Sequence, residues 1–452
     1  MDFGRLSFDP APSITTPPPG PCSQKLLAFQ AAHEGAAVSY PRGFPCALAR
    51  GRGATVQDVD GNVYIDFFAG AGVLAVGHAN PEVVAAAQAQ LADLTHALDL
   101  PTPARQALVE ELREALPPSL TRVFFGGPTG SDAVESAVKL ARLNTGRAPL
   151  ISFEGAYHGM TSGALALSSG RSFKDRLLPL VPEVHFVPYA YCYRCAFNKT
   201  KAACDMECAK YLDHVLDDPH SGIGTPAAVI VEPIQGEGGS IVPPPEFLPM
   251  VRETCERHQV LMIADEIQAG FCRTGTMFAF EHTGTVPDIM TMSKALGGLG
   301  FPISAIAYKE TLNTWGPGAH IGTFRGNVVA YAAGAAALRF MREHDLAGHA
   351  ARLGERLLAL LQEVERDSPF VGEVRGKGLM LGVEFVKDKA TKQPAPDLAS
   401  RVRGLCFQRG LLIEIGGHYS NVARFLPPLV LTEELAKKGA EIFAESVRDL
   451  QK

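Results

Sequence analysis

Charged residues follow three apolar runs in the middle of the chain. Glu232 comes after "AAVIV", Asp265 after "LMIA" and Lys294 after "IMTMS". Because ligands bind at the carboxyl ends of parallel strands, we expect these side chains to meet at one edge of a sheet. A desolvated lysine loses its proton more easily and becomes a nucleophile toward an aldehyde. Two acids and such an amine suit a cofactor with a cationic ring nitrogen and an aldehyde; the alternative is a set of solvated strand ends.

Two further motifs add groups that such a cofactor would need. The run "GGPTGSDAVES" places Gly130 and Ser131 at the start of a helix, where free N–H groups and the helix dipole favour an anion. An ordinary helix cap is the alternative interpretation. The run "FEGAYHGMT" supplies Tyr157 and His158, an aromatic pair in a strand-to-helix loop. Such a pair predicts either stacking on a planar ring or ordinary packing.

Apolar runs that alternate with helical patterns must position these residues. The expected strands are 122–127, 149–155, 227–233, 261–266, 289–294 and 303–308. Continuous apolar runs are typical of a mostly parallel sheet with helices on both faces. Between the first two strands, Val134, Ala137, Val138 and Ala141 follow a helical repeat, and Gly146 marks its end. The sequence therefore predicts an α/β fold.

The chain of 452 residues is long enough for two domains. Its start is rich in proline, and Asp60-Gly61 is a typical hairpin turn. Toward the carboxyl end, long helices alternate with "VRGKGLMLGVEF" and "GLLIEIGG", which predicts a smaller α+β domain built from both termini. The expected divisions are a disordered arm (1–21), the first part of the small domain (22–75), a large domain (76–334) and the remainder of the small domain (335–452).

Composition excludes several classes of partner. The formal net charge is −6 without a basic block, so we expect no nucleic-acid partner. The apolar runs are too short to cross a bilayer, and we expect neither a secretion signal nor a membrane partner. Nine cysteines, an odd number in a large chain, favour a reducing compartment, and we expect a cytoplasmic protein.

Four of these cysteines lie close together in "CYRCAFNKTKAACDMEC". Cys192, Cys195, Cys204 and Cys208 have the spacing C-x2-C-x8-C-x3-C, which is compatible with structural zinc. The alternative is four free cysteines that serve as small buried residues. The expected active site itself includes no metal.

Together and in this order, the motifs resemble those of class III, fold-type I aminotransferases, which depend on pyridoxal 5′-phosphate (PLP). The resemblance runs from about Tyr40 to Leu435. Its markers are "DVDGNVYIDFFAGAGVLAVGH", "GSDAVESAVKLAR", "AYHGM", "EPIQGEGG", "DEIQAGFCRTG", "MTMSKALGGLGFP", "GTFRGN" and "RFLPPLVLTEEL". Within the class, "GTFRGN", "SYPRGFP", "IDFFAGAG" and "FGGPTGS" are similar to diaminobutyrate and ectoine-pathway transaminases.

The resemblance implies a role for each candidate residue. Lys294 would form a Schiff base with PLP and move the substrate proton, and Asp265 would keep the ring nitrogen protonated. Gln268 would lie near the ring 3-oxygen, and Tyr157 would cover one ring face beside His158. The phosphate would be bound by Gly130 and Ser131, and by Thr323 of a neighbouring subunit, which implies a homodimer with a shared active site.

The substrates follow from the same resemblance. Arg424 would bind the α-carboxylate of 2-oxoglutarate or glutamate, and Glu232 would pair with it when an ω-amino donor enters. The predicted reaction moves an amino group from a diamino acid such as 2,4-diaminobutyrate to 2-oxoglutarate. A racemase or epimerase, a PLP-dependent lyase and an inactive PLP-binding protein remain open. Departures from the family pattern are Arg325, Cys272 and Met160, for which the sequence suggests no function.

Overall fold

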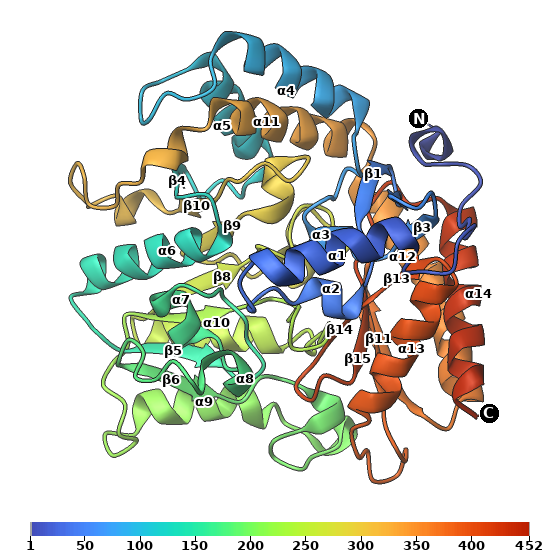
Figure 1. Cartoon of the computed structure of the whole chain (residues 1–452). Helices are drawn as coiled ribbons and strands as arrows, with labels where there is room; N and C mark the ends of the chain where they lie inside the picture. Colours follow the sequence, from blue (N-terminus) through green and yellow to red (C-terminus); the bar gives the residue numbers. More distant parts are fainter. Residues whose placement is uncertain (1, 452) are drawn as a thin grey trace.

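A computed structural model describes residues 2–451, and its centre is a seven-stranded sheet. The strand order is β4-β10-β9-β8-β7-β5-β6 (Figure 1). Its strands are β4 (Arg122–Phe125), β5 (Leu150–Phe153), β6 (Val184–Val187), β7 (Ala228–Val231), β8 (Leu261–Asp265), β9 (Ile289–Met292) and β10 (Ala305–Tyr308). Strands β6, β5, β7, β8 and β9 pair in parallel, whereas β10 is antiparallel to both β9 and β4. The six predicted strands and the mostly parallel sheet are confirmed.

Helices cover both faces of this sheet because its central strands carry apolar residues on both faces. Ile230 of β7 packs in a cluster with Val134 of α6 (Gly130–Thr145). Its neighbours Val229 and Val231 point to the opposite face, where they pack with residues of α9 (Glu207–Asp217) and α10 (Phe247–Arg257). Helix α6 ends at Gly146 in the left-handed conformation, as predicted.

The two ends of the chain come together beside this sheet (Figure 1). One four-stranded sheet has the order β1-β2-β3-β13, in which Leu411 of β13 lies opposite Ile65 of β3 in a parallel pair. A second has the order β11-β12-β15-β14. Their strands are β1 (Leu48–Arg52), β2 (Thr55–Asp58), β3 (Val63–Asp66), β11 (Val371–Lys377), β12 (Met380–Phe385), β13 (Leu411–Leu412), β14 (Glu414–Gly416) and β15 (Val422–Phe425). This arrangement supports the predicted α+β unit, whose exact boundaries stay a prediction.

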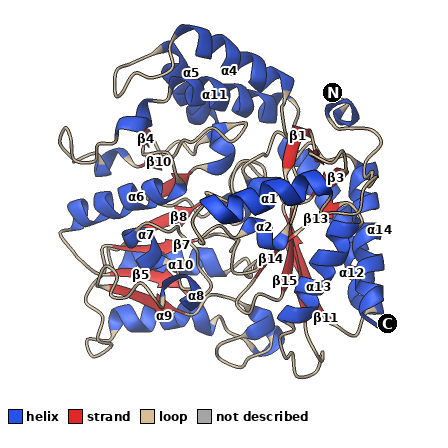
Figure 2. Ribbon diagram, viewed as in Figure 1, coloured by secondary structure: helices blue, strands red, loops and turns tan. Residues whose placement is uncertain are grey.

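The remaining α-helices surround these sheets, as Figure 2 shows. They are α1 (Pro21–His33), α2 (Tyr40–Gly43), α3 (Ala69–Gly72), α4 (Pro81–Asp93), α5 (Pro103–Ala115), α7 (Ser162–Leu167), α8 (Arg171–Lys174), α11 (Val328–Glu343), α12 (Leu346–Asp367), α13 (Pro396–Gln408) and α14 (Glu433–Arg448). Helix α11 packs against α4 and α5, while α12 and α13 pack against α14. Within residues 2–451, no helix is both long and apolar enough to traverse a bilayer.

The proline-rich arm differs from the predicted disorder at 1–21. Position 1 lies outside the described residues, but the rest of the arm follows the β2–β3 hairpin. The backbone of Ser13 exchanges hydrogen bonds of 2.9 and 2.8 Å with Val63. The Asn62 side chain accepts a hydrogen bond of 2.9 Å from the Thr15 N–H. The hairpin thus supplies partners for the polar backbone of the arm, which composition alone does not reveal.

Candidate active site

A cavity of about 720 Å³ lies at the carboxyl ends of the central strands. Its lining includes nine of the predicted site residues, namely Gly130, Ser131, Tyr157, His158, Glu232, Asp265, Gln268, Lys294 and Arg424. They come from loops and element ends far apart in the sequence, which meet because β7, β8 and β9 run in parallel. Thr323 is not among the described residues that line this cavity.

Lys294 follows β9 and supplies the amine of the site. Its backbone has a φ of +48°, a left-handed conformation that is uncommon for lysine. The pKa of Lys294 is lowered to about 8, mainly because the amine is removed from solvent and also because Arg424 is near, while Asp265 and Glu232 act in the opposite direction. A lysine with such a pKa has a substantial neutral fraction near neutral pH and can attack an aldehyde.

Asp265 ends β8, and three polar contacts fix the position of its carboxyl group. It lies 2.7 Å from His158 Nδ1, and it accepts from the Thr291 hydroxyl at 3.0 Å and the Ile267 N–H at 3.1 Å. Thr291 is opposite Asp265 in the β8–β9 pair, so the sheet register places its hydroxyl there. The sequence analysis missed Thr291, although it is the one hydroxyl in "IMTM". His158 was predicted to contact the cofactor ring, whereas in the structure it orients the carboxyl group of Asp265.

Gly130 and Ser131 form the first turn of α6 at one end of the cavity. The N–H groups of a first turn have no partner within the helix, and the dipole there attracts an anion. The close approach of the neighbouring loop depends on Gly159, because a Cβ atom there would lie 2.1 Å from Ser131 Oγ. This end of the cavity is therefore suited to a phosphate group.

Glu232 does not contact Arg424 in this structure, and the pair that the resemblance implies when an ω-amino donor enters stays a prediction. Glu232 accepts hydrogen bonds from the N–H groups of Tyr157 at 3.1 Å and Gly236 at 2.8 Å. Burial raises its pKa to about 7. The carboxylate turns toward its own loop because these buried N–H groups need an acceptor. In this structure Glu232 braces the loop that carries Tyr157, and it does not contact the arginine.

Arg424 instead contacts Glu237 and Glu414, and we call these three residues the pocket cluster. Its Nη2 atom lies 2.7 Å from Glu237 Oε2 and 2.8 Å from Glu414 Oε2. All three line the cavity, and so does Tyr40, whose pKa is raised to about 12 by burial and by both carboxylates. Neither glutamate was predicted from the sequence, although Glu237 lies within "EPIQGEGG" and Glu414 within "GLLIEIGG".

The remaining predicted pocket residues have structural partners that fix their positions. Gln268 donates from Nε2 to the Ala71 carbonyl at 3.1 Å. Tyr157 packs edge-on against Phe173, with the ring centroids 5.4 Å apart. Both side chains line the cavity, and their predicted contacts with the cofactor ring stay predictions.

The donor set around the cavity fits PLP. A nucleophilic amine, a hydrogen-bonded carboxylate and a helix N-terminus are the groups that an aldehyde, a pyridine nitrogen and a phosphate require. Lys294, Asp265 and Ser131 supply them around a single space, whose volume is typical of a cofactor pocket. These three residues would hold the group.

Arg325, which had no predicted function, has a structural partner. It forms an ion pair with Asp99, and its carbonyl accepts a hydrogen bond from the Tyr331 hydroxyl. A backbone hydrogen bond of 3.0 Å from Ala97 to Gly326 joins the same two segments. Arg325 therefore fastens the loop that carries Thr323 to the segment before α5. Cys272 is buried and Met160 is exposed, and neither has a contact that explains its departure from the family pattern.

The cysteine-rich segment lies away from the active site. Cys192, Cys195, Cys204 and Cys208 line a cavity of about 20 Å³, which is no larger than one water molecule. Across residues 2–451, no three histidine, cysteine, aspartate or glutamate side chains are grouped so that they could hold a metal ion. The structure therefore gives the zinc alternative no support.

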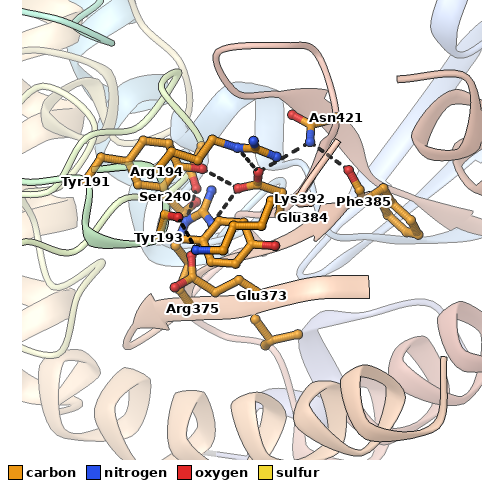
Figure 3. Close-up of polar contacts among 12 residues, drawn as sticks. Tyr191, Tyr193, Arg194, Ser240, Glu373, Arg375, Glu384, Phe385, Lys392 and Asn421 are labelled. Atoms are coloured by element: carbon orange, nitrogen blue, oxygen red, sulfur yellow. Dashed lines mark hydrogen bonds and ion pairs between the residues drawn. The ribbon is translucent and has the colours of Figure 1, made fainter. Parts of the chain in front are cut away.

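The same segment begins with a buried polar network (Figure 3). Arg375 contacts Glu373 at 2.5 Å and Glu384 at 2.7 Å, and we call these three residues the interior cluster. Glu384 also accepts hydrogen bonds from the Tyr191 hydroxyl and, at 2.6 Å, from Arg194 Nε. Figure 3 shows these side chains converging between the segment and the strands β11 and β12. The network thus connects the segment that follows β6 to strands β11 and β12 of the C-terminal sheet.

Comparisons with known proteins agree with this geometry. Residues 37–447 match the family described as aminotransferase class-III. The diaminobutyrate–2-oxoglutarate aminotransferase of Haemophilus influenzae is 42% identical over 438 residues, which are 95% of this chain and 96% of that protein. The protein of the same name from Rhizobium meliloti is 44% identical and covers 90% of this chain and 89% of its own length.

Solved structures show the same likeness. An amine transaminase from an uncultivated Pseudomonas species, solved in a PLP-bound form, is 31% identical with a TM-score of 0.83, over 92% of this chain and 98% of its own. The match to the family covers far more than half of the chain, and the similar proteins match it almost end to end. The chain therefore belongs to the class-III aminotransferase family and is a PLP-dependent aminotransferase of fold-type I.

Proposed function

We propose that the enzyme moves the terminal amino group of a diamino acid, with 2,4-diaminobutyrate as the first candidate, to 2-oxoglutarate and so forms glutamate. The names of the similar proteins from Haemophilus influenzae and Rhizobium meliloti support these substrates. The observation that carries the proposal is the pocket cluster, in which one guanidinium beside Lys294 is covered by carboxylates.

Different residues around the cavity have different roles in amino transfer. Bound PLP supplies an aldehyde that takes up the amino group and a ring that withdraws electrons from the reacting carbon. Asp265, fixed by His158 and Thr291, keeps the ring nitrogen protonated. Lys294 holds and moves a proton at Nζ, for which a pKa of about 8 is well matched near neutral pH. The first turn of α6 binds the phosphate.

The amino donor and 2-oxoglutarate must bind in the same pocket in turn. Arg424 can serve both, because it can be free to bind a carboxylate or be neutralised by a glutamate. A guanidinium binds a carboxylate through paired hydrogen bonds, so 2-oxoglutarate needs Arg424 uncovered. Glu237 lies in a loop after β7 and its side chain is 34% exposed, so it can leave the arginine at little cost. With Glu237 in place, Arg424 is neutralised and an amine end can enter. We therefore assign to Glu237 the exchange that the family resemblance implies for Glu232.

The direct test supplies the PLP-loaded enzyme with 2,4-diaminobutyrate and 2-oxoglutarate. Glutamate should form in step with consumption of the donor, and omission of 2-oxoglutarate should stop turnover after one half-reaction. Chiral chromatography of the remaining donor is the second measurement. Accumulation of the opposite enantiomer without glutamate would assign the scaffold to racemisation instead.

We further propose that two copies form a homodimer. Segments around 94–100 and 321–324 carry exposed apolar side chains, namely Leu94, Leu98, Leu100, Ile321 and Phe324. A hydrogen bond of 2.6 Å between His96 Nε2 and the Thr323 carbonyl oxygen places these two segments side by side. A contiguous apolar surface of this kind is typical of an interface. It would also bring Thr323 to the phosphate of the second copy.

Light scattering of the purified protein tests this assembly. We expect twice the mass of one chain, and Phe324→Asp should shift the mass toward one chain and weaken PLP binding. Phe29→Asp changes another exposed aromatic residue, outside these segments, and serves as the control. A parent protein with the mass of one chain would contradict the proposal.

We also infer a cytoplasmic location, which the nine unpaired cysteines support.

A further inference from the structure

The pocket cluster contains one more carboxylate than the arginine needs. Arg424 is neutralised by a single glutamate, yet its Nη2 atom contacts both Glu237 and Glu414. Glu414 also faces the charge of Lys294 and of Arg403, and it is repelled by Glu237. A carboxylate beyond the one that neutralises Arg424, at the wall of a cavity, can pair with a cation that enters from outside the chain.

Glu414 and Glu237 are held in different ways. Glu414 is the first residue of β14 and lies directly opposite Arg424 in the antiparallel β14–β15 pair. Its side chain is 14% exposed, against 34% for Glu237, which is carried by a loop. The sheet register therefore keeps Glu414 beside the arginine whether Glu237 stays or leaves. The wall then presents a fixed negative charge next to a fixed positive charge.

That pair of charges matches one end of a diamino acid. The carbon atom far from the reacting amine carries an ammonium group and a carboxylate side by side. We propose that Glu414 binds this second, non-reacting ammonium group and so selects diamino acids over amines that lack it. The inference rests on the proposed transfer from a diamino acid, and it assigns the selection of the donor to a single residue.

The matched substrates 2,4-diaminobutyrate and 4-aminobutyrate test this role. They share the chain, the carboxylate and the reacting amine, and they differ only in the second amino group. Glu414→Gln keeps the shape of the side chain and removes its charge, while Glu237 still neutralises Arg424. We expect the ratio of kcat/KM for 2,4-diaminobutyrate to that for 4-aminobutyrate to fall by about ten- to a hundredfold, because a polar pocket rejects a substrate that leaves it unpaired.

Glu237→Gln is the control, because it removes the other carboxylate from the same guanidinium. Its absolute rates will change, but the ratio should stay within about threefold of the parent value. An equal fall of the ratio in both variants would overturn the inference, since the effect would then belong to Arg424. Should Glu414→Gln melt well below the parent, Glu414→Asp keeps the charge at a shorter reach and should retain an intermediate ratio.

A binding measurement removes turnover from the comparison. In a Lys294→Ala background, calorimetry gives a dissociation constant for each ligand, and Glu414→Gln should weaken 2,4-diaminobutyrate by about tenfold more than 4-aminobutyrate. Different results would contradict the proposed function and the role of Glu414. A parent enzyme that forms no glutamate from 2,4-diaminobutyrate would overturn the proposed function together with this inference. A parent that uses it, beside a Glu414→Gln ratio within threefold of the parent's, would overturn the inference alone.

Discussion

The pocket cluster and the interior cluster are built from the same parts, one arginine between two glutamates, and they differ in their surroundings. In the pocket cluster, Glu237 and Glu414 retain 34% and 14% of their side-chain exposure and line a cavity. In the interior cluster, Glu384 is fully buried and its oxygen atoms are taken up by Arg375, Arg194 and Tyr191 (Figure 3).

This difference distinguishes a ligand-binding site from a buried network that only stabilises the fold. Both carboxylate oxygen atoms of Glu384 accept from groups of the same chain, so this buried carboxylate is already fully paired. The pocket cluster has a spare carboxylate, and its glutamates are partly exposed at the cavity. Composition and ion pairing are therefore equal in the two regions, and the unused bonding capacity at a cavity is what indicates function.

The largest expected effect is confined to the pocket. Lys294→Ala removes the amine that attacks the aldehyde and moves the proton, so turnover should fall by at least about 10⁴-fold. The melting temperature should change little, and the interior cluster should be unaffected. Steady-state assays and thermal unfolding check both halves of this prediction. Near-normal turnover without added amine would contradict the role of Lys294.

The sharpest comparison makes the same substitution in each cluster. Arg375→Ala leaves the buried Glu384 short of its partner, and the free energy of unfolding should fall by about 3 to 5 kcal/mol. Arg424→Ala leaves carboxylates that water in the cavity can hydrate, so its cost in stability should be smaller. It should instead lower kcat/KM for 2-oxoglutarate by about a hundredfold.

Chemical denaturation and single-turnover kinetics of the two arginine variants decide this comparison. Equal losses of stability would mean that burial at the pocket wall matters as much as burial in the interior. Equal damage by Arg424→Ala to the donor and the 2-oxoglutarate half-reactions would mean that the arginine does not distinguish the two substrates.

A smaller effect on stability is expected from the tyrosine hydroxyl groups beside the interior cluster. Tyr191→Phe removes a hydrogen bond to the Glu384 carboxylate and should lower the free energy of unfolding by about 1 to 2 kcal/mol. Tyr193→Phe is the matched control, because the buried Tyr193 hydroxyl lacks a hydrogen-bond partner within the described part of the chain. The ratio of donor rates should be the same in both variants. A changed ratio would link the interior cluster to catalysis.

The smallest effect concerns the pH dependence of PLP uptake. Below about pH 8 Lys294 is largely protonated and cannot attack, so the rate at which the PLP-free protein binds PLP should rise about tenfold per pH unit there and level off above. Arg424→Ala removes a nearby positive charge and should move the midpoint upward. Absorbance stopped-flow measures the profile. A midpoint near 10.5 would mean that Lys294 behaves as an ordinary exposed lysine.

Much of the fold could be predicted from the sequence because its signals are local. The apolar runs that became β7, β8 and β9 are short, continuous and followed by charged residues, and helix α6 carries both its repeat and its terminal Gly146. Strand β6 (Val184–Val187) was missed because "VHFV" is short and includes a histidine. The arm was predicted to be disordered because its partners lie in the hairpin, remote from its own composition.

Asp265 and Lys294 could be placed at the carboxyl ends of two strands from the sequence, because continuous apolar runs mark strand ends without knowledge of the rest of the molecule. The carboxylates that meet Arg424 could not be predicted in this way. Glu232 and Glu237 lie five positions apart in one loop, and the turn between them sends the first to backbone N–H groups and the second to the arginine. Glu414 reaches Arg424 through the register of two short strands. Such pairings depend on how distant segments pack, and a pattern of residue types contains no record of them.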